Sequence, residues 1–225
     1  MMNAWKHFKT ITTHKILVMR YCFKIGLYKQ GLLHDLSKYS WTEFRMGCRY
    51  YQGTRSPNNA EREASGISTS WLHHKGRNKH HYEYWVDYGI QCDTVITGME
   101  MPRKYVAEMI IDRICACKVY ANGTYSDQAA VKYYENGKDR LWFIHKKTKA
   151  QMEFLLRMLA EKGEDYTLHY IRYVFLRNRK NRRNSSKREF AFRRKRDAVC
   201  KQNGLFSGKR FYFFTEYEEG KRSAR

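Results

Sequence analysis

Apolar residues recur at the three- and four-residue spacing of an amphipathic helix near the start of the chain. Over residues 4–28, the side chains of Ile11, Val18 and Ile25 fall on one side of such a helix. His14 falls on the same side, so an imidazole faces the expected core. Burying a polar group is costly unless it has a partner. His14 is therefore a candidate for a function-bearing site.

A second stretch, residues 102–120, carries apolar residues on two sides of the expected helix. Pro102 opens it, as proline does at a first helical position. A helix that is apolar on two sides is a central one, and one of its apolar stripes contains a single carboxylate, that of Asp112. A lone buried aspartate needs a metal ion, an arginine or several hydrogen-bond donors.

The rest of the pattern predicts shorter helices separated by loops, and therefore an all-α fold. Gly26 and Gly31 separate the first helix from a short second one, which begins near Leu32 and contains His34 and Asp35. Further helices are expected at about residues 41–51, 59–74, 79–88, 126–136, 148–162 and 166–180, with a loop at 52–58 and a linker at about 89–101.

The composition is that of a globular protein without a membrane segment. Of the 225 residues, 42% are apolar, and no apolar run approaches the length that spans a bilayer. The N-terminus lacks the continuous apolar stretch of a signal peptide. The six cysteines have no Cys-x-x-Cys spacing, which favours reduced, packed thiols. The sequence thus predicts a cytoplasmic protein that makes no use of a membrane.

The formal net charge of +22 is unevenly distributed. Residues 170–225 hold 18 Lys and Arg against 5 Asp and Glu, which favours an anionic partner, nucleic acid first. A solvated tail that only aids solubility is the other interpretation. Residues 204–214 read as a turn followed by a short aromatic strand or hairpin. We therefore expect a helical domain at 1–165 and a basic, aromatic-containing extension at 166–225.

Four residues stand out as metal-ligand candidates: His14, His34, Asp35 and Asp112. Imidazole and carboxylate are the ligands of hydrolytic transition-metal ions. Adjacent residues on a helix point about 100° apart, yet His34 and Asp35 can meet one ion because imidazole reaches further. Taken singly, each candidate has another interpretation: a hydrogen-bonded core histidine, a helix cap, or the ion-pair partner of an arginine. Together they favour a site for Mn²⁺, Fe²⁺, Co²⁺, Ni²⁺ or Zn²⁺.

Two histidine pairs, His73-His74 and His80-His81, flank one expected tight turn. We expect one member of each pair to face inward and the other to face solvent. An exposed basic turn that contacts phosphate is the alternative. Arg77 lies between the pairs, where its guanidinium can clamp a phosphate bidentately or simply remain solvated.

Three further polar residues are placed by their spacing on helices. Lys38 projects from the same surface as the His-Asp pair and can neutralise a phosphate as a point charge. Glu108 lies one turn before Asp112 on the same face, as a partner that orients a ligand histidine or as a proton carrier. Glu43 follows Ser40 by three residues, as in a capping box, which gives it a structural role.

The order of these groups resembles the signature of the HD-domain superfamily of metal-dependent phosphohydrolases. The segment from Gly31 to Lys38 carries this resemblance. A tighter resemblance is to a family of small, uncharacterised bacterial and phage HD-like proteins, in the stretches from His34 to Lys38, from Trp71 to Trp85 and from Met101 to Asp112. It implies an HD-like helical core in which an early His, the His-Asp pair and a later Asp hold one ion. By the same pattern, one histidine of each later pair holds a second ion.

The resemblance further implies a phosphohydrolase that acts on a nucleotide or another phosphoester through metal-activated water. Lys38 and Arg77 would offset charge on the phosphoryl group. The competing hypothesis is a nucleic-acid-binding protein with a structural or degenerate HD-like core. In that case the basic tail neutralises phosphates, and aromatic residues such as Phe190, Phe192 and Tyr212 stack on bases.

Overall fold

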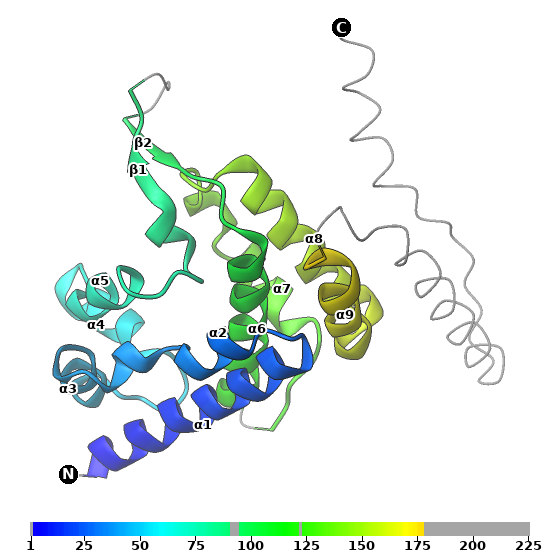
Figure 1. Ribbon diagram of the computed structural model, residues 1–225. Helices are drawn as coiled ribbons and strands as arrows, with labels where there is room; N and C mark the ends of the chain where they lie inside the picture. Colours follow the sequence, from blue (N-terminus) through cyan, green and yellow to red (C-terminus); the bar gives the residue numbers. More distant parts are fainter. Residues whose placement is uncertain (1, 91–94, 122, 178–225) are drawn as a thin grey trace, which may run out of the picture. The chain divides into compact units, whose positions relative to one another are not determined.

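The computed structural model describes residues 2–90, 95–121 and 123–177. The all-α prediction is confirmed, since helices make up most of the described chain and one small strand pair accompanies them (Figure 1). In chain order the helices are α1 (Met2–Lys24), α2 (Tyr28–Leu33), α3 (Trp41–Arg49), α4 (Pro57–Ser65), α5 (Thr69–Lys75), α6 (Arg103–Tyr120), α7 (Ala129–Glu135), α8 (Lys146–Lys162) and α9 (Glu164–Tyr170).

The hydrophobic core forms around α6, which packs against α1, α7 and α8 (Figure 1). Val106, Ile110 and Ile114 of α6 are fully buried, and so is Val18 of α1. Pro102 stands immediately before α6, where its missing amide hydrogen costs nothing. The two stretches with the clearest helical periodicity are therefore the two helices that meet in the core.

The His-Asp pair lies on a break in the chain, and the prediction of a helix through it is wrong. Helix α2 ends at Leu33, His34 is non-helical, and a 3-10 turn then runs over Leu36–Tyr39. Asp35 between them has φ +53° and is the one non-glycine residue with positive φ in the described chain. Aspartate tolerates this left-handed conformation better than most residues. The break points both side chains at the same interior site.

The expected helix over 59–74 is two helices, α4 and α5. Gly66 ends α4 with φ +76°, a conformation that glycine adopts without strain. Ser68 then caps α5, because its hydroxyl accepts a hydrogen bond from the Trp71 amide at 3.0 Å. The serine and glycine between the helices were the signals for this break.

The predicted helix after Lys79 is also wrong. A 3-10 turn over Tyr82–Trp85 leads into β1 (Val86–Tyr88), which pairs antiparallel with β2 (Ile96–Gly98). Gly98 lies close to the backbone that precedes α8, so that an added Cβ would stand 2.2 Å from the Phe143 carbonyl oxygen. Only glycine permits this approach. β1 thus lies at the end of the expected helix at 79–88, and β2 lies in the expected linker at 89–101.

The compact unit extends through Arg177, beyond the boundary expected at 165. Leu168 of α9 is buried in the main core, as are Ile171 and Phe175 of the π-helical turn Ile171–Phe175. The start of the expected extension therefore belongs to the helical domain. The basic runs and the aromatic strand predicted in the tail lie outside the described residues.

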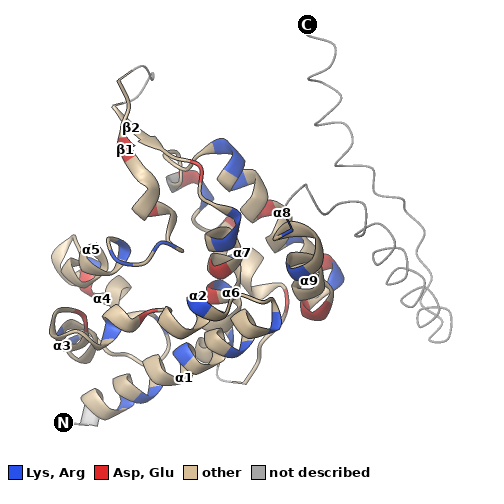
Figure 2. Ribbon diagram, viewed as in Figure 1, with Lys and Arg blue, Asp and Glu red and all other residues tan. Residues whose placement is uncertain are grey.

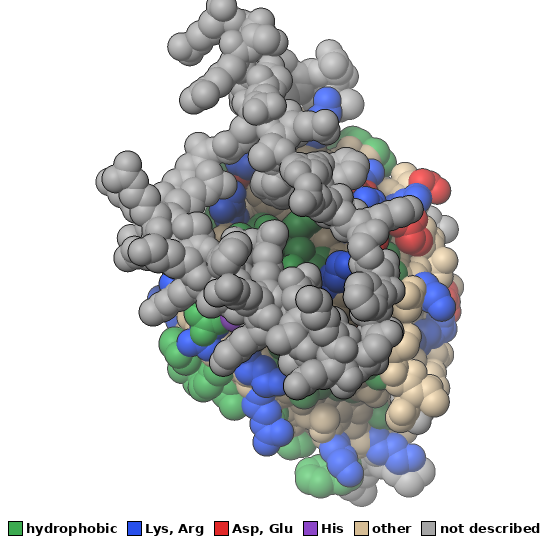
Figure 3. All heavy atoms as spheres, turned by 90° about the vertical axis from the view of Figure 1, so that its right-hand side faces the viewer, with side chains coloured by type: hydrophobic (Ala, Val, Ile, Leu, Met, Phe, Trp, Pro, Cys, Tyr) green, Lys and Arg blue, Asp and Glu red, His purple; other side chains and the backbone are tan. Residues whose placement is uncertain are grey.

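Basic side chains are widely distributed over the described surface. Figure 2 shows Lys and Arg recurring along α1, with acidic residues placed mainly elsewhere. In the view of Figure 3, Lys and Arg side chains lie among hydrophobic ones where described residues are visible. Within the described ranges, no helix is both long enough and apolar enough to cross a membrane.

Candidate metal centre

Four candidate ligands converge from three parts of the chain. His14 comes from α1, His34 and Asp35 from the break after α2, and Asp112 from α6. The Nε2 atom of His14 lies 2.9 Å from Oδ1 of Asp112, and Nε2 of His34 lies 3.5 Å from the same oxygen. Both nitrogens also face Oδ2 of Asp35, at 3.7 and 3.4 Å. We call these four residues the first donor set.

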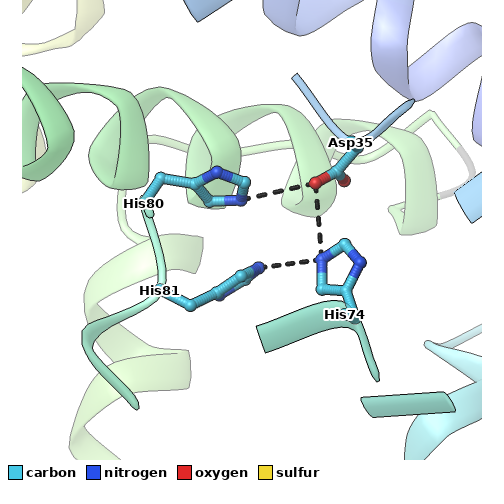
Figure 4. A group of neighbouring side chains, drawn as sticks. All are labelled: Asp35, His74, His80 and His81. Atoms are coloured by element: carbon cyan, nitrogen blue, oxygen red, sulfur yellow. Dashed lines mark hydrogen bonds and ion pairs between the residues drawn. The ribbon is translucent and has the colours of Figure 1, made fainter. Parts of the chain in front are cut away.

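A second donor set lies on the other side of Asp35 and is shown in Figure 4. Oδ1 of Asp35 lies 3.3 Å from Nε2 of His74 and 3.4 Å from Nε2 of His80. The Nε2 atoms of His74 and His81 are 2.9 Å apart. The second set therefore consists of Asp35, His74, His80 and His81. Asp35 belongs to both sets, with one carboxylate oxygen turned toward each.

The donor atoms are buried without ordinary partners. Nε2 of His14, His34 and His80 and Oδ1 of Asp35 form no regular hydrogen bond among the described residues, and Oδ2 of Asp35 has an ion pair with Lys38. Unsatisfied buried polar atoms are rare and costly. Two donors that share an ion at about 2.1 Å are separated by about 3.0–3.4 Å in octahedral or tetrahedral coordination. Three of the four histidine contacts of Asp35, at 3.3–3.4 Å, have this spacing, so the two donor sets could hold metal ions.

Glu108 fixes the orientation of one histidine in each set. Its Oε1 accepts from Nδ1 of His34 at 3.0 Å and lies 3.2 Å from Nδ1 of His80. Burial opposes ionisation of Glu108, but the two histidine hydrogen bonds lower its pKa below the usual range. An ionised carboxylate only accepts hydrogen bonds, so both Nδ1 atoms carry protons. Both Nε2 atoms then present lone pairs to the donor sets.

Glu43 orients the His74 ring in the same way, a role that the sequence did not predict. Its Oε2 lies 2.8 Å from Nδ1 of His74, and its Oε1 lies 2.6 Å from Nδ1 of His73. Burial opposes ionisation here as well, but the hydrogen bond from His74 lowers the pKa of Glu43. The Ser40 cap was correctly predicted, since Ser40 Oγ accepts from the Glu43 amide. The missed signal was Gly47, one turn later, which is buried on the same side of α3 as Glu43.

The aspartates of the site are held ionised. Burial alone would raise a carboxyl pKa, but the charges of His34 and Lys38 lower the pKa of Asp35 well below its usual range. Burial also opposes charge on Asp112, whose pKa is lowered well below its usual range by the neighbouring imidazoles of His14 and His34. The result is a buried anionic cluster, which is costly without a cation at its centre.

The surroundings shift the pKa values of His81 and His34 in opposite directions. Burial and the neighbouring His80 and His74 lower the pKa of His81 well below its usual value, which keeps it neutral. Burial also opposes charge on His34, but the Asp35 carboxylate and its acidic neighbours raise the pKa of His34 well above its usual value. The centre of the cluster therefore attracts positive charge, either a proton or a metal ion.

Two lysines contact the His-Asp break. Lys38 Nζ lies 2.6 Å from Oδ2 of Asp35, and its side chain is 28% exposed. Burial opposes its charge, but Asp35 and Asp112 raise the pKa of Lys38 above its usual range, so it remains a cation. Lys15 Nζ donates to the carbonyl oxygens of Leu32 at 2.8 Å and His34 at 3.0 Å. The sequence did not predict the Lys15 contact, because it depends on where the backbone runs between α2 and the 3-10 turn.

Not every candidate joins the donor sets. His73 is turned to Glu43 and lies outside both sets. Arg77 is exposed and donates to the His73 carbonyl oxygen at 3.2 Å. The expectation that one histidine of each pair faces inward describes His73 and His74. It does not describe the second pair, because His80 and His81 both belong to the second donor set.

The fold and the site define a helical protein with a buried histidine and carboxylate cluster that could hold metal ions. Residues 3–158 match the model of a family of unknown function, DUF5662, and the chain belongs to this family. The matched range contains every residue of both donor sets. Comparison with curated proteins and with solved structures found no match.

Proposed function

We propose that this protein is a metal-dependent phosphohydrolase that acts on a nucleotide or another phosphoester. The observation that carries the proposal is the pair of donor sets sharing Asp35, in which several buried donor atoms form no regular hydrogen bond among the described residues. The ordered resemblance of the sequence to the HD-domain phosphohydrolases supports it. Those ordered residues come from separate elements, and they meet at one place.

The donors suit one or two divalent transition-metal ions. The first set offers two imidazoles and two carboxylates, and the second offers three imidazoles and the shared carboxylate of Asp35. Such mixed nitrogen and oxygen sets suit Mn²⁺, Fe²⁺, Co²⁺, Ni²⁺ or Zn²⁺. A bound ion supplies a water of lowered pKa and polarises a phosphoryl oxygen.

Other side chains of the protein would orient the metal ligands and neutralise charge on the phosphate. Glu108 and Glu43 keep three of the five donor histidines in the tautomer that presents Nε2. Lys38 is a partly exposed cation beside Asp35, so it can neutralise charge on a phosphoryl group that enters the site. Arg77 lies on the exposed turn between His74 and His80, where it can clamp a more distant phosphate.

The decisive experiment combines metal analysis with a substrate screen. Purified protein should contain metal, and a screen of nucleotides, cyclic nucleotides and generic phosphoesters with each of the five ions should give turnover that chelation abolishes. Asp112→Ala should abolish turnover with little loss of helix content. Lys38→Ala should keep the metal and lose rate, since it acts on phosphate. Metal-free protein with no turnover under any ion would reject the proposal.

The second candidate function is nucleic-acid binding by the basic C-terminal residues, with a structural core. The 18 Lys and Arg in residues 170–225 favour it. Metal content separates the two candidates. Stoichiometric metal that is lost in the double variant His34→Ala, Asp35→Ala supports the hydrolase, whereas a metal-free protein that binds nucleic acid supports the second candidate.

A further inference from the structure

The first three helices have a surface without acidic side chains. Residues 1–60 contain 10 Lys and Arg but only two acidic residues, Asp35 and Glu43. Both of these are buried, and both are directed at the candidate metal centre. The exposed charges of α1–α3 are therefore all positive, and the surface should attract an anionic partner.

Exposed aromatic residues are interleaved with these bases. On α3, Trp41 and Arg45 lie one turn apart and both are exposed, with 73% of the Trp41 surface accessible. On α1, Trp5 and Lys9 have the same spacing, with 68% of the Trp5 surface accessible. A contiguous exposed apolar patch, unlike a single exposed side chain, marks an interaction site.

Aromatic ring contacts connect α1 to α3 beside these exposed residues. The Trp5 ring stacks on Phe8 with centroids 5.9 Å apart, and Phe8 meets the Tyr39 ring at 5.9 Å and the Phe44 ring at 6.5 Å. Tyr39 lies two residues before Trp41 in the chain. We call this surface, with Trp5, Lys6, Lys9, Trp41, Arg45 and Arg49 as its exposed members, the α1–α3 face.

We propose that the α1–α3 face binds single-stranded nucleic acid. A single strand offers phosphates and unstacked bases in alternation, and proteins bind it with a basic surface and aromatic stacking platforms. The face presents the same alternation, with Trp5 next to Lys6 and Trp41 one turn from Arg45. A helix that lies in a membrane interface instead separates an apolar face from a charged one. The interleaved pattern therefore favours nucleic acid over an anionic lipid surface.

This site is distinct from the basic tail and from the metal centre. None of its exposed members belongs to a donor set, so binding is separable from metal loading and from turnover. It goes beyond the proposed function, since it requires no hydrolysis.

The test compares two full-length variants that lose the same groups. The test variant is Trp41→Ala, Lys9→Gln, Arg45→Gln. The control variant is Trp142→Ala, Lys146→Gln, Arg157→Gln, which removes one exposed tryptophan and two exposed bases from residues 142–157. Both keep the basic tail, and both lose the same charge. Circular dichroism confirms that each retains its helices.

Binding is measured by fluorescence anisotropy on a phosphorothioate oligothymidylate about 20 nucleotides long, so that no turnover intervenes. The test variant should bind about 10-fold or more weakly than wild type, and the control should lose much less. Trp41→Ala alone should weaken binding without changing its salt dependence, because stacking releases no counterions. Lys9→Gln with Arg45→Gln should flatten the salt dependence by about one and a half units of slope.

Equal losses in the two variants would show that only net charge matters and would overturn the proposal. Two other results would also overturn it. The first is oligonucleotide binding that is unchanged while sedimentation with phosphatidylserine vesicles is lost, which would assign the face to a lipid surface. The second is unchanged oligonucleotide binding with a dimer converted to a monomer, which would assign it to self-association.

Discussion

The carboxylate of Glu43 lies 2.8 Å from Nδ1 of His74, which is 31 residues further along the chain. His74 Nε2 points to the second donor set, so Glu43 acts on that set only through this ring. Glu43→Gln should weaken the second ion by about 10- to 100-fold, because the amide no longer fixes the tautomer. Isothermal titration calorimetry with the metal ion measures the two affinities. First-set binding should be unchanged.

His73→Ala is the matched control for this prediction, since His73 contacts the same carboxylate but lies outside both donor sets. It should leave both affinities nearly unchanged. Glu108→Gln is the contrasting variant, because Glu108 contacts one histidine of each set, and both affinities should fall. A Glu43→Gln protein that loses the two ions equally would contradict the assignment.

Lys15 should stabilise the break that carries the His-Asp pair. Its ammonium is bonded to two backbone carbonyl oxygens, those of Leu32 and His34. Lys15→Met keeps the length of the side chain but removes both bonds, and it should lower the free energy of unfolding by about 1–3 kcal/mol. Metal affinity should fall with it. Lys9→Met on the same helix has no such contact and should be neutral in urea denaturation.

Asp35 should combine two roles that substitutions can separate. Asp35→Asn retains a residue that tolerates positive φ but loses the charge that both sets share. It should fold and bind neither ion tightly. Asp35→Ala should lose the ions and also about 1 kcal/mol of stability, because alanine is strained at φ +53°. Asp112→Asn is the control, since it should weaken only the first ion.

The helices of the core could be predicted from the sequence because their apolar residues keep a helical spacing over many residues. Over α1 and α6 the same residues that set the period, such as Val18 and Ile110, are those that are buried. Shorter segments were less well predicted. The helix expected after Lys79 is a 3-10 turn and a strand, since β-branched and aromatic residues there suit the strand pair.

Ligand types were predictable for the site, but its geometry was not. His14 and Asp112 were placed on the core side of their helices by spacing alone. The shared role of Asp35 depends on its left-handed backbone, and no local pattern predicts that. Glu43 was assigned to a cap because its partner His74 is distant in sequence and its contact is tertiary.

Gly98 should be one of the least replaceable residues of the hairpin. A Cβ there would lie 2.2 Å from the Phe143 carbonyl oxygen and 2.6 Å from the His145 amide, both of them backbone atoms. Gly98→Ala should therefore destabilise the fold by about 2 kcal/mol or more, since backbone must move. Gly137→Ala is the control, because no atom lies within 4 Å of its Cβ position. Thermal denaturation of both variants checks this, and equal midpoints would contradict the close approach.

His7 should make the fold sensitive to acid. Its ring lies against Gly47 and Phe44, and burial together with the Lys38 charge lowers its pKa from 6.5 to about 4. The unfolded chain takes up this proton near pH 6.5, whereas the folded chain resists it. The contribution of His7 to stability is therefore complete above pH 6.5 and is lost as the pH falls toward 4, by up to about 3 kcal/mol.

His7→Gln removes the titrating group, and its packing cost is the same at every pH. The free energy of unfolding of wild type minus that of the variant, measured by urea denaturation between pH 7.5 and 4, should therefore fall by up to about 3 kcal/mol, and it changes sign if the packing cost is smaller than this. The difference between the two curves isolates His7 from the other histidines, because those titrate in both proteins. Curves that stay parallel over this range would show that His7 is freely protonated in the folded state, and its burial against Gly47 would then have no electrostatic consequence.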